Sequence, residues 1–465
     1  MTPSKILYGL ALAWHFAWAA TVATPSDWDP AYYLEVARHI ARGDGAVTDA
    51  VWNLGFLPDS LRHPADLHWM PLPSRVLVPL VGRAGVGQEW PASQLCAVLI
   101  AAAWAPLGWA WAKRLQANDG LAWATGLICA SAGGYVRTIT TPDSIALYGL
   151  LGGAALLAAS QRRAIAIPLA GLVAVTRGDG FLLAIACTIA WKGFEGSSVG
   201  VAGLIAAGAW AARCYLLAGD GWLALRERAA NSVTLQQVLS APAPPVPTLT
   251  ERAAFLGGEL GTIGAVWLVI TVGVLALPAV VELYKRRADR GLWPLPAYAL
   301  GFPLVIHLLA PAIAAEGSVY RSNSALFAPL SALAVVGVAN LTKRYHPAFL
   351  PSLLVTATFA GSTMMGRAYM HVLTQLGDDC AALEQAGVPV GASVMSYDPI
   401  GVSARCEHPG VVMARGAPLG ELAARYGIEW VLVAPAGYDN GTVRARDFDL
   451  PGFIQRNDRV FQRVR

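Results

Sequence analysis

The sequence predicts an α-helical membrane protein that crosses the bilayer many times and carries a small α/β domain near its C-terminus. The first observation is composition: 55% of the 465 residues are hydrophobic and 14% are charged, whereas soluble domains carry about 25% charged residues. The second is a series of apolar runs of the length that membrane helices require. The third is a change after residue 365, where short apolar runs alternate with polar segments.

The apolar runs predict about eleven membrane helices. A helix needs about 20 apolar residues to cross the hydrocarbon core of a bilayer. The runs lie at 6–23, 92–112, 120–135, 143–160, 164–176, 180–193, 198–217, 261–284, 292–313, 325–341 and 347–365. Two of them, 164–176 and 180–193, are the shortest and are expected to be partial or broken spans. We therefore expect residues 1–365 to form a transmembrane module and residues 366–465 to form a separate domain.

The positive charges predict the orientation of this module. Lys and Arg concentrate in short loops such as Lys113-Arg114 and Arg162-Arg163, and loops of this kind stay in the cytoplasm. The opposite side receives the first loop (24–91), a Pro-rich second loop (219–260) and the C-terminal domain. We expect a multi-pass membrane protein whose active face is periplasmic or extracellular. The net charge of +4 follows from the loop bias, so no nucleic-acid partner is expected.

The C-terminal segment has the pattern of a small α/β domain. Residues 393–397 and 430–434 are typical of buried strands, and 418–426 is typical of a helix between them. Cys380 and Cys406 lie in this segment and can form a disulfide if it is outside the cytoplasm. The other four cysteines fall in apolar runs and are expected to be inert core residues: Cys96, Cys129, Cys187 and Cys214.

The first loop contains the strongest catalytic candidates, Asp27 and Asp29, directly after the first apolar run. A partly desolvated carboxylate can act as a general base toward an acceptor hydroxyl or amine. An Asp-x-Asp pair can also hold a hard divalent cation. The structural alternative is that Asp29 caps a helix, because Pro30 follows it and proline is common at the first helical position.

Three arginines, Arg137, Arg177 and Arg321, lie in short turns on the non-cytoplasmic side. A guanidinium group matches the geometry of a phosphate, so these arginines are candidates to bind an anionic lipid head group. Alternatively, each side chain extends to the membrane interface independently. Asp143 and Asp179 lie near the first two, where they can position substrate hydroxyls, pair with arginine or cap helices.

His63 and His68 of the first loop are candidates to orient an acceptor or to ligate a metal. A divalent metal held by Asp27, Asp29 and His63 is one possibility, since carboxylates suit hard cations and imidazole suits transition metals. The alternative is that both histidines are hydrogen-bonded loop residues.

Several segments resemble those of the GT-C glycosyltransferases, a superfamily of polytopic enzymes that includes protein O-mannosyltransferases and lipid A aminoarabinose transferases. In the first loop they are Asp29-Pro30-Ala31-Tyr32-Tyr33-Leu34, Ala37-Arg38, Gly43-Asp44-Gly45, His63-Pro64 and Trp69-Met70-Pro71-Leu72. Further along the chain they are Thr141-Pro142-Asp143-Ser144, Thr176-Arg177-Gly178-Asp179-Gly180 and Tyr320-Arg321-Ser322-Asn323. The resemblance extends over most of the chain.

The resemblance implies transfer of a sugar from a polyprenyl phosphate to a lipid, glycan or protein acceptor, with inversion at the anomeric carbon. Asp29 matches the first-loop aspartate of the family, and Tyr320 joins the arginines as a substrate-binding candidate. The chain has Asp29-Pro30 where the protein O-mannosyltransferases have Asp-Glu, which argues against a protein acceptor. The competing interpretations are a transporter or flippase for a lipid-linked saccharide, and a ligase of such saccharides.

Overall fold

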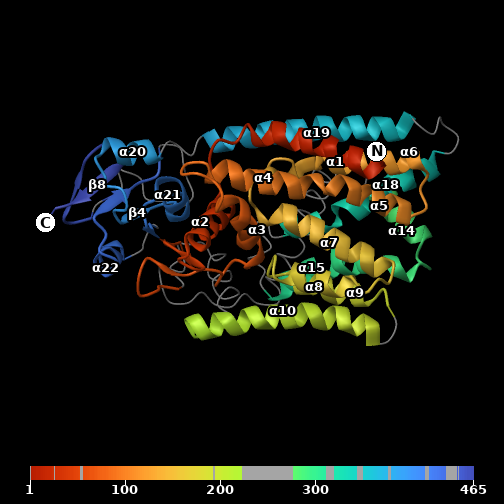
Figure 1. Cartoon of the computed structure of the whole chain (residues 1–465), viewed down its shortest axis with the longest axis horizontal. Helices are drawn as coiled ribbons and strands as arrows, with labels where there is room; N and C mark the ends of the chain where they lie inside the picture. Colours follow the sequence, from red (N-terminus) through yellow and green to blue (C-terminus); the bar gives the residue numbers. More distant parts are fainter. Residues whose placement is uncertain are drawn as a thin grey trace.

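The computed structural model is a helical bundle with a small sheet at one end (Figure 1). The bundle helices are α1 (Pro3–Ala19), α4 (Glu89–Ala102), α5 (Trp104–Arg114), α6 (Asp119–Ser131), α7 (Ser144–Ser160), α8 (Ala166–Ala174), α9 (Gly180–Thr188), α10 (Phe194–Ala218), α14 (Ala276–Lys285), α15 (Pro294–Leu309), α18 (Ser324–Leu341) and α19 (Phe349–Thr374). The structure describes residues 2–25, 27–52, 56–191, 194–221, 276–309, 319–342, 349–374, 379–413, 418–435, 448 and 450–464.

Small residues allow the bundle helices to approach closely. A Cβ atom at Gly149 of α7 would overlap the indole ring of Trp104 on α5. The same indole donates a hydrogen bond from Nε1 to the carbonyl of Ala146 at 2.9 Å. Helices in a bilayer gain little from burying apolar surface against one another, so close packing and interhelical hydrogen bonds hold them together.

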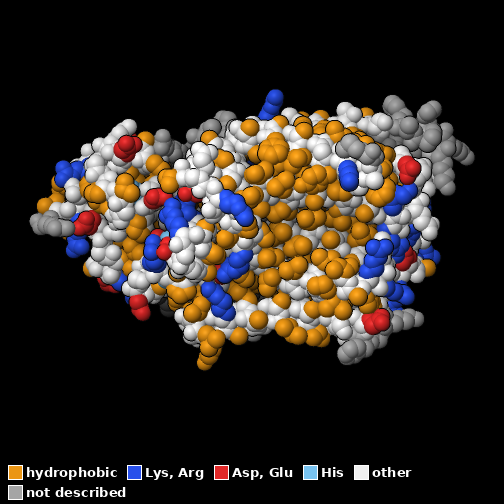
Figure 2. Space-filling model, in the orientation of Figure 1, with side chains coloured by type: hydrophobic (Ala, Val, Ile, Leu, Met, Phe, Trp, Pro, Cys, Tyr) orange, Lys and Arg blue, Asp and Glu red, His pale blue; other side chains and the backbone are white. Residues whose placement is uncertain are grey.

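The surface of the bundle is that of a membrane protein. On the face that Figure 2 shows, hydrophobic side chains cover the bundle between two borders where Lys and Arg gather. Within the described residues, three helical stretches are long and apolar enough to cross a membrane: Glu89–Arg114, Glu195–Ala218 and Ser324–Leu341. Several expected spans are shorter helices, and the 261–284 run is described only from residue 276, so the count of eleven remains a prediction.

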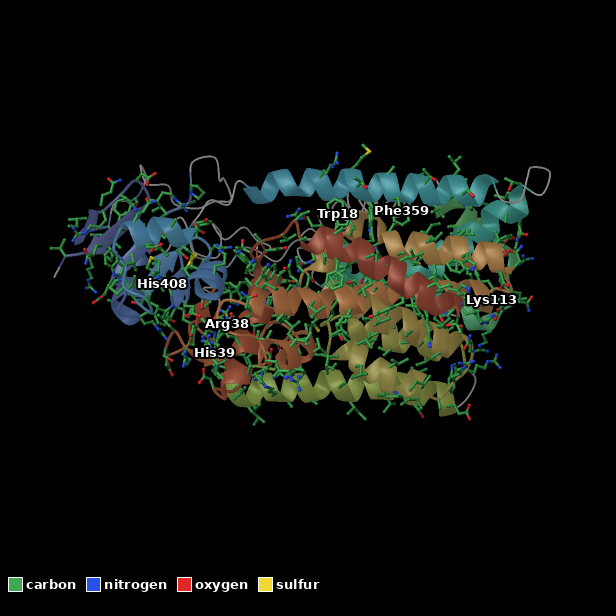
Figure 3. The ribbon with its side chains drawn as sticks, turned by 45° about the horizontal axis from the view of Figure 1, so that its top comes forward. Trp18, Arg38, His39, Lys113, Phe359 and His408 are labelled. Carbon is green, nitrogen blue, oxygen red and sulfur yellow. A yellow bond between two sulfur atoms is a disulfide. The ribbon has the colours of Figure 1, made fainter. Side chains whose placement is uncertain are left out.

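The first loop folds against one end of the bundle. It contains α2 (Trp28–Arg42), α3 (Leu72–Val81) and three short strands, β1 (Val47–Thr48), β2 (Ala50–Val51) and β3 (His63–Pro64). Figure 3 places Arg38 and His39 of α2 at this end and Lys113 at the opposite end. The expected second loop, 219–260, lies outside the described residues beyond residue 221.

The C-terminal residues from 379 onward, here called the C-terminal module, pack on the first loop. The described residues of this module form three helices and five strands: α20 (Asp379–Gln385), α21 (Pro399–Cys406), α22 (Leu419–Arg425), β4 (Val394–Ser396), β5 (Gly410–Val412), β6 (Trp430–Leu432), β7 (Phe453–Gln455) and β8 (Val460–Arg463). The strands predicted at 393–397 and 430–434 are present as β4 and β6, with α22 between them in sequence.

One sheet joins the first loop to the C-terminal module. Its strand order is β2-β5-β4-β6-β8-β7. The first four strands pair in parallel, and β8 pairs antiparallel with both of its neighbours, β6 and β7. Strand β2 comes from the first loop and pairs Ala50 with Gly410. The expected division at residue 365 also falls within α19, which continues to Thr374. The two expected domains thus share a sheet and a continuous helix.

The cysteines follow the sequence-based expectation. Cys380 and Cys406 form a disulfide that connects α20 to α21, with their Cα atoms 5.3 Å apart. The other four cysteines are reduced and buried. The disulfide therefore fixes two helices of the C-terminal module next to the first loop.

Candidate active site

Asp29 lies in the first turn of α2, and its carboxylate faces two partners. Its Oδ1 accepts a hydrogen bond from Nε1 of Trp69 at 2.9 Å, and its Oδ2 forms an ion pair with Arg321. The residue is only 7% exposed. The proposal that Asp29 caps the helix is wrong: Asp27 occupies the N-cap and accepts from the backbone N–H of Trp28 at 2.7 Å. The carboxylate of Asp29 is therefore not used for capping and is held by Trp69 and Arg321.

An aromatic cluster of the first loop holds Trp69 against Asp29. The Trp69 ring stacks on Tyr32 with centroids 4.2 Å apart, and it also contacts the rings of Trp52 and His68 at 4.7 and 4.8 Å. His68 thus lies in this cluster, beside the residue that binds Asp29. Trp69 was not predicted as a site residue; the available signal was that a buried indole N–H requires an acceptor.

Three carboxylates surround the guanidinium of Arg321. Besides its pair with Asp29, Arg321 lies 3.6 Å from Oδ2 of Asp27, and it interacts electrostatically with Asp143. Asp143 also caps α7, accepting from the N–H of Ile145 at 3.0 Å. One arginine facing three carboxylates leaves an excess of negative charge, which favours binding of a cation or a proton.

A second polar cluster holds Arg177 beside the first. Its Nε donates to Asp179 at 2.9 Å, its Nη2 donates to the hydroxyl of Ser322 at 3.3 Å, and its guanidinium lies 5.4 Å from the Tyr148 ring centroid. Ser322 in turn donates to Asp179. Arg177 and Arg321 interact electrostatically, so two of the three predicted arginines converge. Because Ser322 follows Arg321 directly, this cluster positions Arg321.

The opposite side of Arg321 is fixed by Tyr320. The short helix α17 (Val319–Ser322) carries both residues. The Tyr320 ring stacks on Tyr135 at 4.6 Å, the Tyr320 hydroxyl donates to the carbonyl of Gly134 at 3.0 Å, and its own carbonyl accepts from the Tyr135 hydroxyl at 2.7 Å. Tyr135 ends η1 (Gly133–Tyr135), and Arg137 lies buried between η1 and η2 (Thr138–Thr140). Tyr320 is thus an anchor for α17.

The expected metal-ligand set of Asp27, Asp29 and His63 is not brought together. Strand β3 pairs His63 with Thr48, and the His63 ring hydrogen-bonds through Nδ1 to the carbonyl of Leu61 at 2.7 Å. Among the described residues, the ligating side chains close enough to share a metal ion are Glu35, His39 and Asp49, whose ligand atoms lie within 4.8 Å of one another.

Protein groups already occupy the ligand atoms of this second set. Glu35 accepts hydrogen bonds from the hydroxyl of Thr48, the N–H of Asp49 and the hydroxyl of Ser403, at 2.6 to 2.9 Å. Arg62 forms two hydrogen bonds with the Asp49 carboxylate, at 2.7 and 3.0 Å. A metal ion would therefore compete with several existing bonds.

The ring of His39 bridges two carboxylates in the same set. Its Nδ1 lies 2.9 Å from Asp44 and its Nε2 lies 3.2 Å from Asp49. Although burial favours the neutral ring, these two hydrogen bonds raise the pKa of His39 above its ordinary value. A metal needs the neutral imidazole. The geometry therefore suits a metal ion, whereas the raised pKa of His39 favours an ion-paired network.

The fold of this chain is similar to that of an archaeal oligosaccharyltransferase. The crystal structure of the apo oligosaccharyltransferase of Archaeoglobus fulgidus matches 92% of this chain and 69% of its own, with 13% identity and a TM-score of 0.50. The structure of that enzyme in complex with zinc and sulfate matches 93% of this chain and 67% of its own, with 12% identity and a TM-score of 0.53. No protein-family model and no curated protein sequence matches the chain.

Proposed function

We propose that this protein is an integral membrane glycosyltransferase that moves a sugar from a polyprenyl-phosphate donor to an acceptor, with inversion. The observation that carries the proposal is the buried Asp29 carboxylate, paired with Arg321 where the first loop meets the bundle. The fold shared with oligosaccharyltransferases supports the same class of reaction. The acceptor is a lipid, a glycan or a protein.

The proposed reaction uses both members of the Asp29–Arg321 pair. The acceptor oxygen attacks the anomeric carbon, the bond from that carbon to the phosphate oxygen breaks, and the acceptor proton passes to Asp29. Polyprenyl phosphate leaves with the bonding electrons. Arg321 is placed to turn from Asp29 to this phosphate, because guanidinium groups bind phosphate oxygens with charge-assisted hydrogen bonds. The same movement releases Asp29 to act as the base.

The excess negative charge of the site supports a divalent cation as a cofactor. Asp27 and Asp29 are the carboxylates that would hold it, and it would offset the repulsion between these groups and the donor phosphate. The Glu35, His39 and Asp49 set is the second place for a metal.

Metal dependence can be assigned to one set or the other by two matched variants. We expect chelation to lower activity, and Asp27→Asn to raise the metal concentration needed for half-maximal activity, because it removes one of the charged ligands. Asp49→Asn should leave that concentration unchanged. Metal titration of the chelated protein measures both. If only Asp49→Asn raised the metal concentration needed for half-maximal activity, the metal would be assigned to the second set. Full activity after chelation would show that no metal is needed.

The proposed function is tested by reconstituting the purified protein in liposomes with polyprenyl-phosphate-linked sugars. We expect release of polyprenyl phosphate and formation of a new glycoside. Mass spectrometry of cell-envelope glycans with and without the protein would identify the sugar and the acceptor.

A flippase would move the lipid-linked sugar between leaflets without breaking its glycosidic bond, and a ligase would use a longer saccharide. The first loop and the C-terminal module lie at one end of the bundle (Figure 1). Arg321 pairs with Asp29 of the first loop, which favours an enzyme with a single active face.

The C-terminal module is predicted to be extracytoplasmic in a bacterial inner membrane. A cysteine at Val390, which is 83% exposed, should react with an impermeant thiol reagent in spheroplasts. A cysteine at Asp119, whose side chain is 81% exposed near the opposite end of the bundle, should react only after lysis. The buried native cysteines give a low background. The reverse pattern of labelling would contradict the orientation.

A further inference from the structure

Arg405 of α21 connects the C-terminal module to the segment that leads into Asp27. Its Nη1 donates a hydrogen bond to the carbonyl of Pro25 at 2.9 Å. Its Nη2 lies 3.0 Å from carboxylate oxygens of both Asp379 and Asp398. The side chain is 13% exposed. A single guanidinium thus joins two carboxylates of the C-terminal module to a backbone carbonyl two residues before Asp27.

The cluster that holds Arg405 is balanced in charge and firmly placed. Arg459 is the second cation of the cluster and pairs with Asp379, whose carboxylate also accepts from the Tyr397 hydroxyl at 2.8 Å. Burial raises the pKa of Asp379, and both arginines oppose this effect. The Cys380–Cys406 disulfide joins the residues next to Asp379 and Arg405. The position of the Arg405 guanidinium is therefore set by the module around it.

Helix α21 also packs directly on α2. The hydroxyl of Ser403 donates to Glu35 at 2.6 Å, and Nη1 of Arg38 donates to the carbonyl of Ala404 at 3.0 Å. Ile400 of α21 is buried in the same apolar cluster as residues of α2. Figure 3 shows Arg38 at this junction, with His408 in the neighbouring module. The C-terminal module therefore holds both α2 and the chain that enters it.

We propose that Arg405 is a positioning residue for the Asp27–Asp29 turn and acts through the carbonyl of Pro25. The proposal rests on the proposed function, because it assigns Arg405 to the same reaction. Asp27 caps α2 and Asp29 lies in its first turn, so the direction in which the chain enters the helix determines where both carboxylates lie. A misplacement of about 1 Å in a catalytic group can lower a rate by about 10²-fold.

The first test compares Arg405→Met with Arg459→Met. Both remove one positive charge from the same cluster, but the described contacts of Arg459 are with Asp379 and the Val433 carbonyl, and not with Pro25. We expect Arg405→Met to lower kcat on the order of 10- to 100-fold with little change in donor KM. Arg459→Met should keep most of its turnover. Arg405→Lys should recover part of the loss, because lysine keeps the charge but lacks the planar guanidinium group with its several N–H donors. Equal losses in both methionine variants would overturn the proposal.

A double variant separates position from charge. Arg405→Met leaves Asp398 without its cation, and Asp398 interacts electrostatically with Asp27. Asp398→Asn removes this charge. The asparagine side chain can still accept a hydrogen bond from the N–H of Gly401, the bond that Asp398 forms at 2.8 Å. We expect the double variant to remain as slow as Arg405→Met. Recovery of normal turnover would show that charge, and not the bond to Pro25, was responsible.

Hydrogen exchange supplies a measurement that does not depend on activity. We expect the amides of Trp28 and Ala31, which donate to Asp27, to exchange faster in Arg405→Met than in Arg459→Met, because only the first variant loses the bond to Pro25. If the parent protein transfers no sugar but this difference is present, the proposed function fails and the connection through Arg405 stands. Equal exchange in the two variants would overturn the connection.

Discussion

Asp29→Asn is expected to lower the turnover of the purified protein by about 10²- to 10⁴-fold, the usual contribution of general-base catalysis. Asparagine has nearly the same size, and its Oδ1 can still accept from Nε1 of Trp69, the contact that Asp29 makes at 2.9 Å. The asparagine side chain cannot take up a proton from the attacking acceptor group at neutral pH. The variant should therefore fold and insert normally while its reaction stops. Initial rates with a lipid-phosphate sugar measure the effect.

Asp27→Asn is the internal control for this prediction. Asp27 caps α2, and asparagine is about as good an N-cap as aspartate, so helix α2 should be unaffected. Its loss of turnover should be smaller than that of Asp29→Asn at saturating metal. An Asp29→Asn protein that works within a few-fold of the parent would exclude Asp29 as the base.

Arg321→Ala is expected to weaken donor binding by about one to two orders of magnitude, because a hydrogen bond to a charged group contributes about 1.5–3 kcal/mol. It also leaves Asp27, Asp29 and Asp143 facing one another without their shared cation. Arg321→Lys should restore part of the affinity, since lysine keeps the charge but lacks the planar guanidinium group, which can donate two hydrogen bonds to one phosphate. Equilibrium binding of polyprenyl phosphate to the purified variants measures the change.

Arg83→Ala is the matched control for Arg321. The Arg83 side chain donates only to the carbonyl of Pro79, at 2.7 Å, among its described hydrogen bonds. Its removal should leave donor affinity unchanged. If Arg321→Ala also binds the donor normally, Arg321 serves to neutralise the carboxylates, and the phosphate is bound elsewhere.

Sequence patterns could identify the candidate site residues but not how they pair. Asp27, Asp29 and Arg321 each stand out because charge is rare and costly near a bilayer. Asp29 and Arg321 are 292 residues apart, and no local pattern predicts which arginine reaches which carboxylate. The same holds for Arg405 and Pro25, which are 380 residues apart. Arg405 lies in an ordinary polar helix, so nothing in its sequence context marks it.

Two errors have local physical causes. Because proline is common at the first helical position, Pro30 predicts that α2 begins directly after Asp29. The N–H groups of the first helical turn have no intrahelical acceptor, so proline is tolerated at any position of that turn. The helix begins earlier, at Trp28. His63 was grouped with the carboxylates because of its place in the first loop. The pairing of β1 with β3 turns it toward Thr48 instead.

The pairing of β2 with β5 imposes an order on the biosynthesis of this protein. Strand β2 is translated early, and its partner Gly410 follows about 360 residues later, roughly 20 to 70 s at ordinary rates of synthesis. Until then, β2 has an unpaired edge, which is a site for misassociation with other chains. The Asp27–Asp29 turn can reach its final shape only after α21 and β5 have been synthesised, because Arg405 contacts Pro25 and Gly410 pairs with Ala50. We expect a protein truncated before α21 to lack these contacts and to lose the proposed activity.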